Sequence, residues 1–346
     1  ADQSRWVGAL SGAHWMAQQV KDKNTTNATA HRVAALWFGG WRDPADNYPT
    51  GVADDPLGAG NYGTLQGDPG TGVIDLALTH ALDQAFLDAL TEAATRQQPY
   101  FWTAIGSGLL YGRDVLVSAD PGFTKERILL CFTDGMENRN PLVDQATKPA
   151  SAGGTYWESA GVPSVRIYGA ALGTTDAFAN GLRTAVANTG GLPALDVKYF
   201  DDATTVGARI QHWFDNTFAG LFNMTPVVSP DPTVGGGATA SHVVTVTEGF
   251  RQLIVNLFMN EPPPPPVNGV PAWTIDLQPP GGSTVITEDD ARSGALGPHV
   301  RLLEGPMYKS LVVDLPLTIP GQSQRWAGDW TFHITRNAQS SGDYLF

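Results

Sequence analysis

The stretch Arg127-Ile-Leu-Leu-Cys-Phe-Thr-Asp-Gly135 decides the fold that is predicted for the N-terminal part of the chain. Its apolar run at 128–132 is typical of a strand buried in the middle of a parallel sheet. Asp134 and Gly135 follow at once, and such residues are typical of a turn after a strand. Ligand sites of α/β sheets lie at this carboxyl edge. The stretch therefore predicts a central strand followed by a functional loop.

Segments typical of strands and helices alternate on both sides of this stretch, up to about residue 222. Such alternation predicts an α/β fold, a doubly wound, mostly parallel sheet with helices on both faces. Helices are expected over 10–20, 74–90, 105–116, 175–188 and 204–222, and strands over 33–38, 127–132, 164–172 and 197–200.

The composition changes at TPVVSPDPTVGGGATAS, which is typical of a linker. No helix is predicted downstream, but several short β runs are. In the last of them Trp330, Phe332 and Ile334 alternate with polar residues, as in a half-buried strand. The sequence predicts an all-β sandwich after the linker. The expected domains are 1–224 with an irregular insertion at 39–72, a linker at 225–241, and the sandwich at 242–346.

The composition excludes several classes of function. There are 34 acidic and 21 basic residues and the net charge is −13, the wrong sign for binding nucleic acid. Cys131 is the single cysteine, so an internal disulfide and a cysteine-built zinc site are excluded. No run approaches the roughly 18–20 apolar residues of a membrane helix. The G-x-S-x-G and H-E-x-x-H patterns are absent, so an enzyme is not predicted.

Three loop segments carry oxygen ligands that could hold a metal ion. Asp2 and Ser4 stand before or at the start of a predicted helix, Thr103 precedes another, and Asp134 follows the apolar strand. If their loops share one sheet edge, two carboxylates and two hydroxyls meet there. These ligands suit a hard divalent cation. Mg²⁺ is the first expectation, with Ca²⁺ or Mn²⁺ as alternatives.

The pieces ADQSRW at 1–6, WTAIGSGLL at 102–110 and ILLCFTDGMEN at 128–138 resemble the von Willebrand factor A-type domain family. The metal-ion-dependent adhesion site of that family follows an Asp-x-Ser-x-Ser, Thr, Asp pattern. The resemblance implies Ser4 and Thr103 as hydroxyl ligands, with Asp2 and Asp134 holding the ion directly or through water. The residues expected to contact a partner beside this site are Trp6, Ser107 and Glu137.

The chain departs from the family pattern in two ways. Trp6 stands where the family has its second serine, so water replaces one ligand or the site is impaired. The sequence begins at Ala1 with no apolar strand before Asp2, so we expect the sheet to lack the central strand of the family, whose neighbours would then expose unpaired backbone groups. We expect a fragment, a processed product, or a central strand that comes from a separate segment. Alternatively, Asp2 and Ser4 only cap a helix, and Trp6 only packs in the core.

A looser resemblance covers the second half of the chain. Its layout, with Gly328-Asp329-Trp330-Thr331-Phe332 near the end, is similar to the β-sandwich that follows the A-type domain in calcium-activated chloride channel regulator-like proteins and bacterial surface relatives.

The predicted function is a non-catalytic, metal-dependent protein-binding or adhesion module of a surface or secreted protein. A metal with an open position would accept an Asp or Glu side chain of the partner. The alternative is a structural subunit of an extracellular filament or appendage, which contacts its neighbours without metal. The two hypotheses differ in whether chelation abolishes the interaction.

Overall fold

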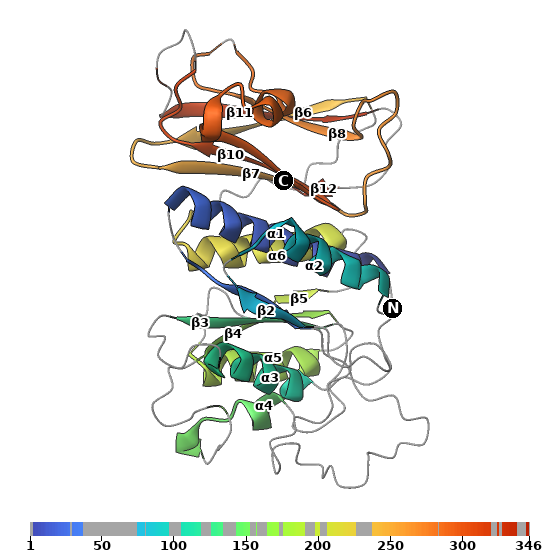
Figure 1. The fold of residues 1–346 in the computed structure, drawn as a ribbon, viewed down its shortest axis with the longest axis vertical. Helices are drawn as coiled ribbons and strands as arrows, with labels where there is room; N and C mark the ends of the chain where they lie inside the picture. Colours follow the sequence, from blue (N-terminus) through green and yellow to red (C-terminus); the bar gives the residue numbers. More distant parts are fainter. Residues whose placement is uncertain are drawn as a thin grey trace. The chain divides into compact units, whose positions relative to one another are not determined.

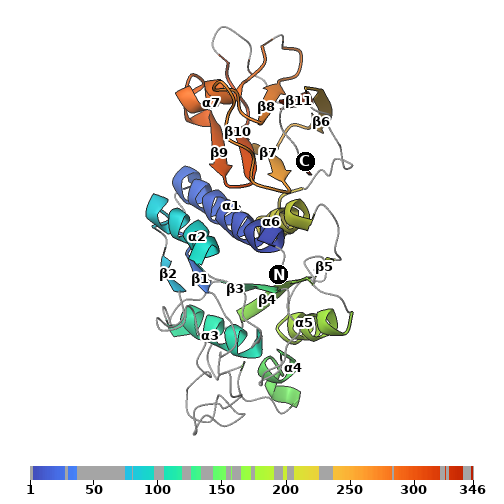
Figure 2. The same ribbon diagram turned by 90° about the vertical axis from the view of Figure 1, so that its right-hand side faces the viewer.

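The computed structural model describes part of the chain, and it shows mixed helices and small sheets (Figures 1 and 2). The described residues are 3–27, 30–36, 75–79, 81–96, 105–118, 126–133, 143–152, 157, 165–172, 176–190, 198–200, 206–225, 237–282, 284–319, 324, 327–337 and 344–345. The predicted insertion at 39–72 lies outside them.

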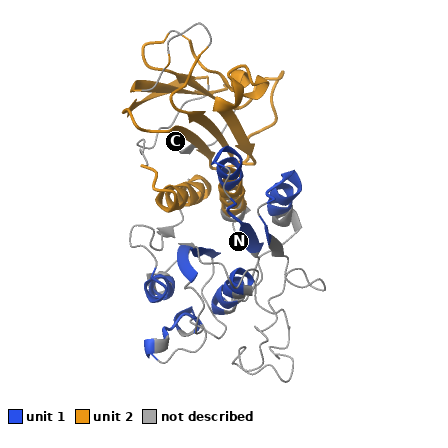
Figure 3. Ribbon diagram, turned by 60° about the vertical axis from the view of Figure 1, so that its left-hand side comes forward, with its two compact units in different colours: residues 1, 19–203 blue, residues 2–18, 204–346 orange. Residues whose placement is uncertain are grey.

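The chain divides into two compact units (Figure 3). Unit 1 is Ala1 with Gln19–Ala203, and unit 2 is Asp2–Gln18 with Thr204–Phe346. The helix α1 (Gln3–Asn27) therefore contributes its first part to unit 2 and its last part to unit 1.

Unit 1 contains two small sheets and several helices. The strands are β1 (Val33–Leu36), β2 (Asp75–Thr79), β3 (Arg127–Thr133), β4 (Val165–Leu172) and β5 (Lys198–Phe200). The helices are α2 (Gln84–Arg96), α3 (Ile105–Ser118), α4 (Val143–Ala146), a 3₁₀ turn at Ala150–Ala152 and α5 (Asp176–Asn188).

The strands β3, β4 and β5 form a parallel sheet that packs against α3 and α5. Cys131 of β3 and Ile167 of β4 are buried in one cluster with Leu109 of α3 and Leu182 of α5. Trp157 joins this cluster and donates its indole N–H to the carbonyl of Val165 at 3.1 Å. Cys131 thus behaves as a small buried apolar residue.

The prediction of a doubly wound, mostly parallel sheet was wrong. In the described part of the chain the strands of unit 1 form two separate sheets, β3–β4–β5 and the antiparallel pair β1–β2. The alternation of helices and strands along a sequence indicates which segments are strands, but it does not state which strands pair. Pairing depends on contacts between segments far apart in the chain.

Two element predictions need correction. The apolar spacing at 74–90 predicted one helix, but residues 75–79 form the strand β2 and a helix begins only at Gln84. A short apolar run fits both a strand and a helix, and its pairing with β1 decides the outcome. Downstream of 242, where no helix was expected, α7 (Glu288–Ser293) is present.

Unit 2 contains two antiparallel sheets. One has the order β12–β7–β10–β9 and the other the order β6–β11–β8. The strands are β6 (Thr239–Val246), β7 (Gln252–Met259), β8 (Trp273–Gln278), β9 (Val300–Gly305), β10 (Tyr308–Asp314), β11 (Gly328–Arg336) and β12 (Tyr344–Leu345). Side chains of both sheets share one core, among them Leu257, Leu311, Ile275 and Trp330.

The first part of α1 and the helix α6 (Val206–Leu221) pack on the other face of the β12–β7–β10–β9 sheet. Trp15 of α1 packs edge-on against Phe258 of β7 and Phe218 of α6. Strand β10 is consequently buried on both faces, with Leu311 toward the inter-sheet core and Ser310 toward the helices. The prediction of an all-β second domain was therefore wrong, because unit 2 also includes the first part of α1, the helix α6 and the helix α7.

The helices α1 and α6 approach closely at Gly8 and Gly207. A Cβ atom at Gly8 would lie 2.8 Å from the Cα of Gly207, and one at Gly207 would lie 2.6 Å from the carbonyl oxygen of Asn260. Both distances are shorter than packed atoms allow. Glycine is thus required at this crossing.

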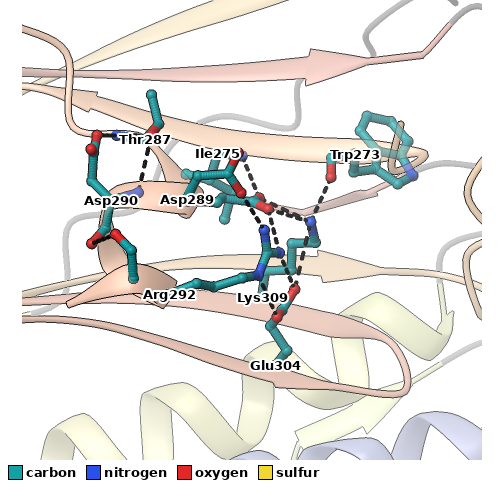
Figure 4. A network of polar contacts seen from close by, with 10 residues as sticks. Trp273, Ile275, Thr287, Asp289, Asp290, Arg292, Glu304 and Lys309 are labelled. Carbon is teal, nitrogen blue, oxygen red and sulfur yellow. Dashed lines mark hydrogen bonds and ion pairs between the residues drawn. The ribbon is translucent and has the colours of Figure 1, made fainter. Parts of the chain in front are cut away.

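A buried ion-pair network fixes α7 to the sheets (Figure 4). Lys309 of β10 donates to both carboxylate oxygens of Glu288 at 2.9 and 2.8 Å, and to the carbonyl of Trp273 at 2.7 Å. Glu288 also accepts from the N–H of Ile275 and from Arg292. Because its charged groups are paired and hydrogen-bonded, this network satisfies the requirement for burying charge.

Candidate interaction surface

The side chains predicted to hold or flank a metal lie outside what the structure describes. Asp2, Thr103, Asp134 and Glu137 belong to segments that are not described. The remaining three, Ser4 and Trp6 in α1 and Ser107 in α3, are helical, but their side chains are not described. The metal site and its partner contacts therefore stay predictions.

The described residues contain no candidate metal-binding cluster and no candidate membrane-spanning helix. Among them, no three or more His, Cys, Asp or Glu side chains are grouped so that they could hold a metal ion. Within the same residues, no helix is both long enough and apolar enough to cross a membrane.

The outer face of the β6–β11–β8 sheet carries side chains that are mostly polar. Alternate residues of β11 point inward, and Trp330, Phe332 and Ile334 are at most 1% exposed, as the sequence predicted. The residues between them face outward. We call this surface the hydroxyl face, and its members are Thr239, Ser241, Val243, Thr245, Thr274, Asp276, Gln278, Asp329, Thr331, His333 and Thr335.

Cross-strand hydrogen bonds order the hydroxyl face. The hydroxyl of Thr239 lies 2.8 Å from that of Thr335, and Ser241 Oγ lies 2.8 Å from His333 Nδ1. Thr245 donates to Asp329 Oδ1 at 2.6 Å. Each pair is directly opposite in the β6–β11 register, where such contacts add about 0.2–1 kcal/mol. The side chains are thus held in place before any partner binds.

The carboxylates of the hydroxyl face are Asp276 on β8 and Asp329 on β11. Burial raises the pKa of Asp276, the nearby Glu288 raises it further, and His333 opposes the shift. His333 lies opposite Asp276 in the β8–β11 register and opposite Ser241 in the β6–β11 register. The three residues thus form one row across the sheet.

This row resembles a catalytic triad in composition only. Ser241 contacts the Nδ1 atom of His333, and both side chains stand on an open sheet surface. Backbone N–H groups in a sheet point along it toward neighbouring strands. The backbone N–H groups around Ser241 therefore do not point out of the sheet, as the donors of an oxyanion hole beside its hydroxyl would have to do. The row therefore presents hydrogen-bonding groups on an exposed sheet surface.

A second polar cluster lies buried between the helices and the sheet of unit 2. The hydroxyl of Tyr308 donates to Gln18 at 2.9 Å and lies 2.7 Å from Nδ1 of His14. Burial raises the pKa of Tyr308 well above its ordinary value, so the hydroxyl stays protonated. Its single proton is directed at Gln18, and His14 Nδ1–H must therefore donate to the phenol oxygen. These bonds connect α1 to β10.

Asp215 makes the stability of unit 2 depend on pH. Its Oδ1 accepts from Asn256 at 3.0 Å, its Oδ2 lies 3.9 Å from His212 Nδ1, and its side chain is 23% exposed. Burial raises its pKa from 3.8 to about 7, while the hydrogen bond from Asn256 opposes the shift. Between these values the folded chain binds more protons than the unfolded chain, so stability falls as pH rises.

The Asp215→Asn variant is therefore expected to lose this pH dependence. Its amide oxygen can still accept from Asn256, and it carries no charge that would be desolvated. Above pH 7 the variant should be more stable than the native chain by up to about 4 kcal/mol, and near pH 4 the two should be nearly equal. Urea unfolding at a series of pH values measures the difference. Equal stabilities above pH 7 would contradict the assignment.

The sequence alone missed the hydroxyl face as a site. Its signal was present, because Thr331 and His333 were assigned to the polar side of a half-buried strand. The neighbours of β11 were not predicted, so the row from Ser241 to Asp276 could not be recognised. The residues of such a row come from strands that are far apart in sequence.

Comparisons with known proteins give a limited result. No known protein family matches the chain, and no curated protein matches it in sequence. In structure it is similar to the pilus adhesin SpaC from Lactobacillus rhamnosus GG, with a TM-score of 0.41 and 11% identity over 100% of this chain and 41% of that chain. The open conformation of SpaC gives a TM-score of 0.38 and 12% identity over 95% of this chain and 36% of that one. The chain thus spans about two-fifths of the length of that pilus adhesin.

Proposed function

We propose that this chain is a non-catalytic protein-binding module of a surface or secreted protein, and that its hydroxyl face binds the partner. The observation that carries the proposal is the preordered row of hydroxyl, imidazole and carboxylate groups on one sheet surface. Ordered side chains lose little entropy on binding. The sheet beneath is rigid because its inner side chains are fully buried.

The chemistry of the face indicates what kind of partner it suits. It presents neutral hydroxyls that both donate and accept, and the carboxylates Asp276 and Asp329 lie among them. Such a surface suits a polar partner that brings N–H, hydroxyl or basic groups. The net charge of −13 favours a basic partner through long-range attraction.

A binding experiment tests this proposal. The native chain and the variant Thr331→Arg are immobilised separately, and purified extracellular proteins are passed over both. The variant places a long, positively charged side chain at the centre of the hydroxyl face. We expect saturable binding of at least one basic protein, weakened roughly tenfold or more in Thr331→Arg, as for the loss of a contact at an interface centre. Ser293→Arg on α7 is the matched control and should bind as the native chain does. Equal binding by Thr331→Arg and the native chain would overturn the proposal.

Metal dependence is a separate proposal that rests on the sequence pattern. Asp2, Ser4, Thr103 and Asp134 together supply the oxygen ligands that Mg²⁺ prefers. We expect Mg²⁺ to bind the native chain in isothermal titration calorimetry and to bind Asp134→Ala roughly tenfold or more weakly, because a charged ligand is lost. Asp289→Ala, an exposed aspartate on α7, is the control. Absence of Mg²⁺ binding to the native chain contradicts the metal site, and partner binding that persists unchanged in EDTA favours the alternative of a metal-free filament subunit.

A further inference from the structure

We propose that two copies of this chain pair through strand β6, edge to edge and antiparallel, with Val243 on the two-fold axis. This goes beyond the proposed binding function, because it uses the edge of the sheet rather than its face. The occupant of the edge is a second copy of the same strand. The argument depends on the backbone of β6, its charge and its exposed valine.

The outer side of β6 is open in the described part of the chain. The sheet order β6–β11–β8 leaves β6 and β8 as its two outer strands. Strand β8 is covered on its outer side, because Leu277 exchanges backbone hydrogen bonds with Ile286 and Ile275 N–H donates to Glu288. No described segment forms backbone hydrogen bonds with β6 other than β11. An open edge of this kind is a template for another strand.

The ladder pattern identifies the backbone groups that face outward. In an antiparallel pair, every second residue directs its N–H and C=O toward the partner strand. The N–H of Arg336 donates to the carbonyl of Ala238, which assigns residues 240, 242 and 244 to the β11 side. Thr239, Ser241, Val243 and Thr245 then direct their backbone groups to the open side. These are also the residues whose side chains are exposed.

Strand β6 lacks the features that usually protect an edge. Its sequence TASHVVTV contains no Lys, no acidic residue and no Pro, and it runs for 8 residues. Natural edge strands are commonly protected by lysine, proline, bulges or short length. The chain as a whole carries a charge of −13, which opposes self-association elsewhere. Two β6 strands bring no like-charged side chains together, so this edge is suited to a second copy.

One register satisfies both the backbone and the side chains. With Val243 opposite Val243, Ser241 lies opposite Thr245, and each directly opposed pair can exchange two backbone hydrogen bonds. Val243 is 61% exposed, more than any other large apolar residue that the structure describes. This register packs the two Val243 side chains against each other and places a hydroxyl opposite a hydroxyl on either side. The contact is self-complementary and closes as a dimer rather than growing as a filament.

Cysteine cross-linking tests the register. Cα atoms of a directly opposed, hydrogen-bonded pair lie about 5.5 Å apart, within the span of a disulfide. We expect Val243→Cys to form a covalent dimer when oxidised by glutathione disulfide. Thr245→Cys is the matched control, because Thr245 faces Ser241 and not its own copy, and it should cross-link much more slowly. The native Cys131 is 2% exposed and should not cross-link.

Sedimentation velocity of the native chain tests the dimer itself, from low micromolar to the highest soluble concentration. We expect the native chain to form a concentration-dependent dimer. The dimer should be lost in Val243→Lys, because two like charges then meet at the two-fold axis. It should also be lost in Val243→Pro, because proline removes a backbone N–H that points to the open side of β6. Val270→Lys, at an exposed valine outside β6, should keep the dimer. A native chain that is monomeric throughout, or equal cross-linking of Thr245→Cys and Val243→Cys, overturns the inference. Partner binding by the native chain is measured separately, so the proposed binding function can be tested even if the chain does not form a dimer.

Discussion

Glu288→Ala is expected to destabilise unit 2 by about 3–5 kcal/mol, because it leaves the charge of a buried lysine without its counter-ion. Lys309 is 8% exposed, and in the native chain it contacts both oxygens of Glu288. After the substitution, the carbonyl of Trp273 and the more distant Glu304, at 3.7 Å, are the contacts that remain for its ammonium group. The N–H of Ile275 also loses its acceptor.

Hydrogen exchange at the amides of β8 and β10 measures this loss within unit 2, since a chain of two units need not unfold in one step. Asp289→Ala is the matched control. Asp289 also pairs with Arg292, but its side chain is 92% exposed, so the expected change is within about 0.5 kcal/mol.

A double variant separates the charge from the packing. The double variant Glu288→Leu with Lys309→Met removes both charges and replaces the two side chains with apolar ones of similar size. Replacing a buried ion pair in this way is often nearly neutral, so the double variant should recover much of the stability that Glu288→Ala loses. A double variant as unstable as Glu288→Ala would show that the hydrogen bond to Ile275, rather than the unpaired charge, dominates.

Trp15→Ala is expected to destabilise unit 2 by about 3–5 kcal/mol, as for a large aromatic removed from a core. Trp15 is 0% exposed and packs on Phe218 and Phe258 with ring centroids at 5.4 and 5.8 Å. Its indole N–H donates to Ser310 Oγ at 2.8 Å. The substitution therefore opens a cavity where α1, α6 and the sheet meet.

Two further variants separate the contributions of Trp15. Trp15→Phe keeps an aromatic ring and loses the N–H donor, so about 1–2 kcal/mol should be lost. Phe250→Ala, at an aromatic side chain that is 42% exposed, should change stability by less than about 0.5 kcal/mol. The measurement is hydrogen exchange at the amides of β7 and β10. If Trp15→Ala left their protection unchanged, α1 would not be an integral part of unit 2.

The sequence predicted individual elements better than their assembly. The strand at 127–132 is found as β3, and the inward set Trp330, Phe332 and Ile334 is buried as expected. In both cases the pattern of apolar residues within one segment reports which side of that segment is covered. The apolar pattern within a segment does not report which other strand it pairs with. In the described part of unit 1, the strands form two sheets, β1–β2 and β3–β4–β5, instead of the single sheet that was expected.

By itself, the sequence predicted many of the strands and helices and the apolar face of β11, because periodicity is a property of neighbouring residues; the strand β2 and the helix α7 were among the exceptions. Only the tertiary structure decided that the first part of α1 packs on β7 and β10, where Trp15 contacts residues 241 and 295 positions away in the chain. It also decided that Ser241, His333 and Asp276 form one row. An apolar face can be buried by any complementary surface, so the choice of surface depends on packing of the whole unit.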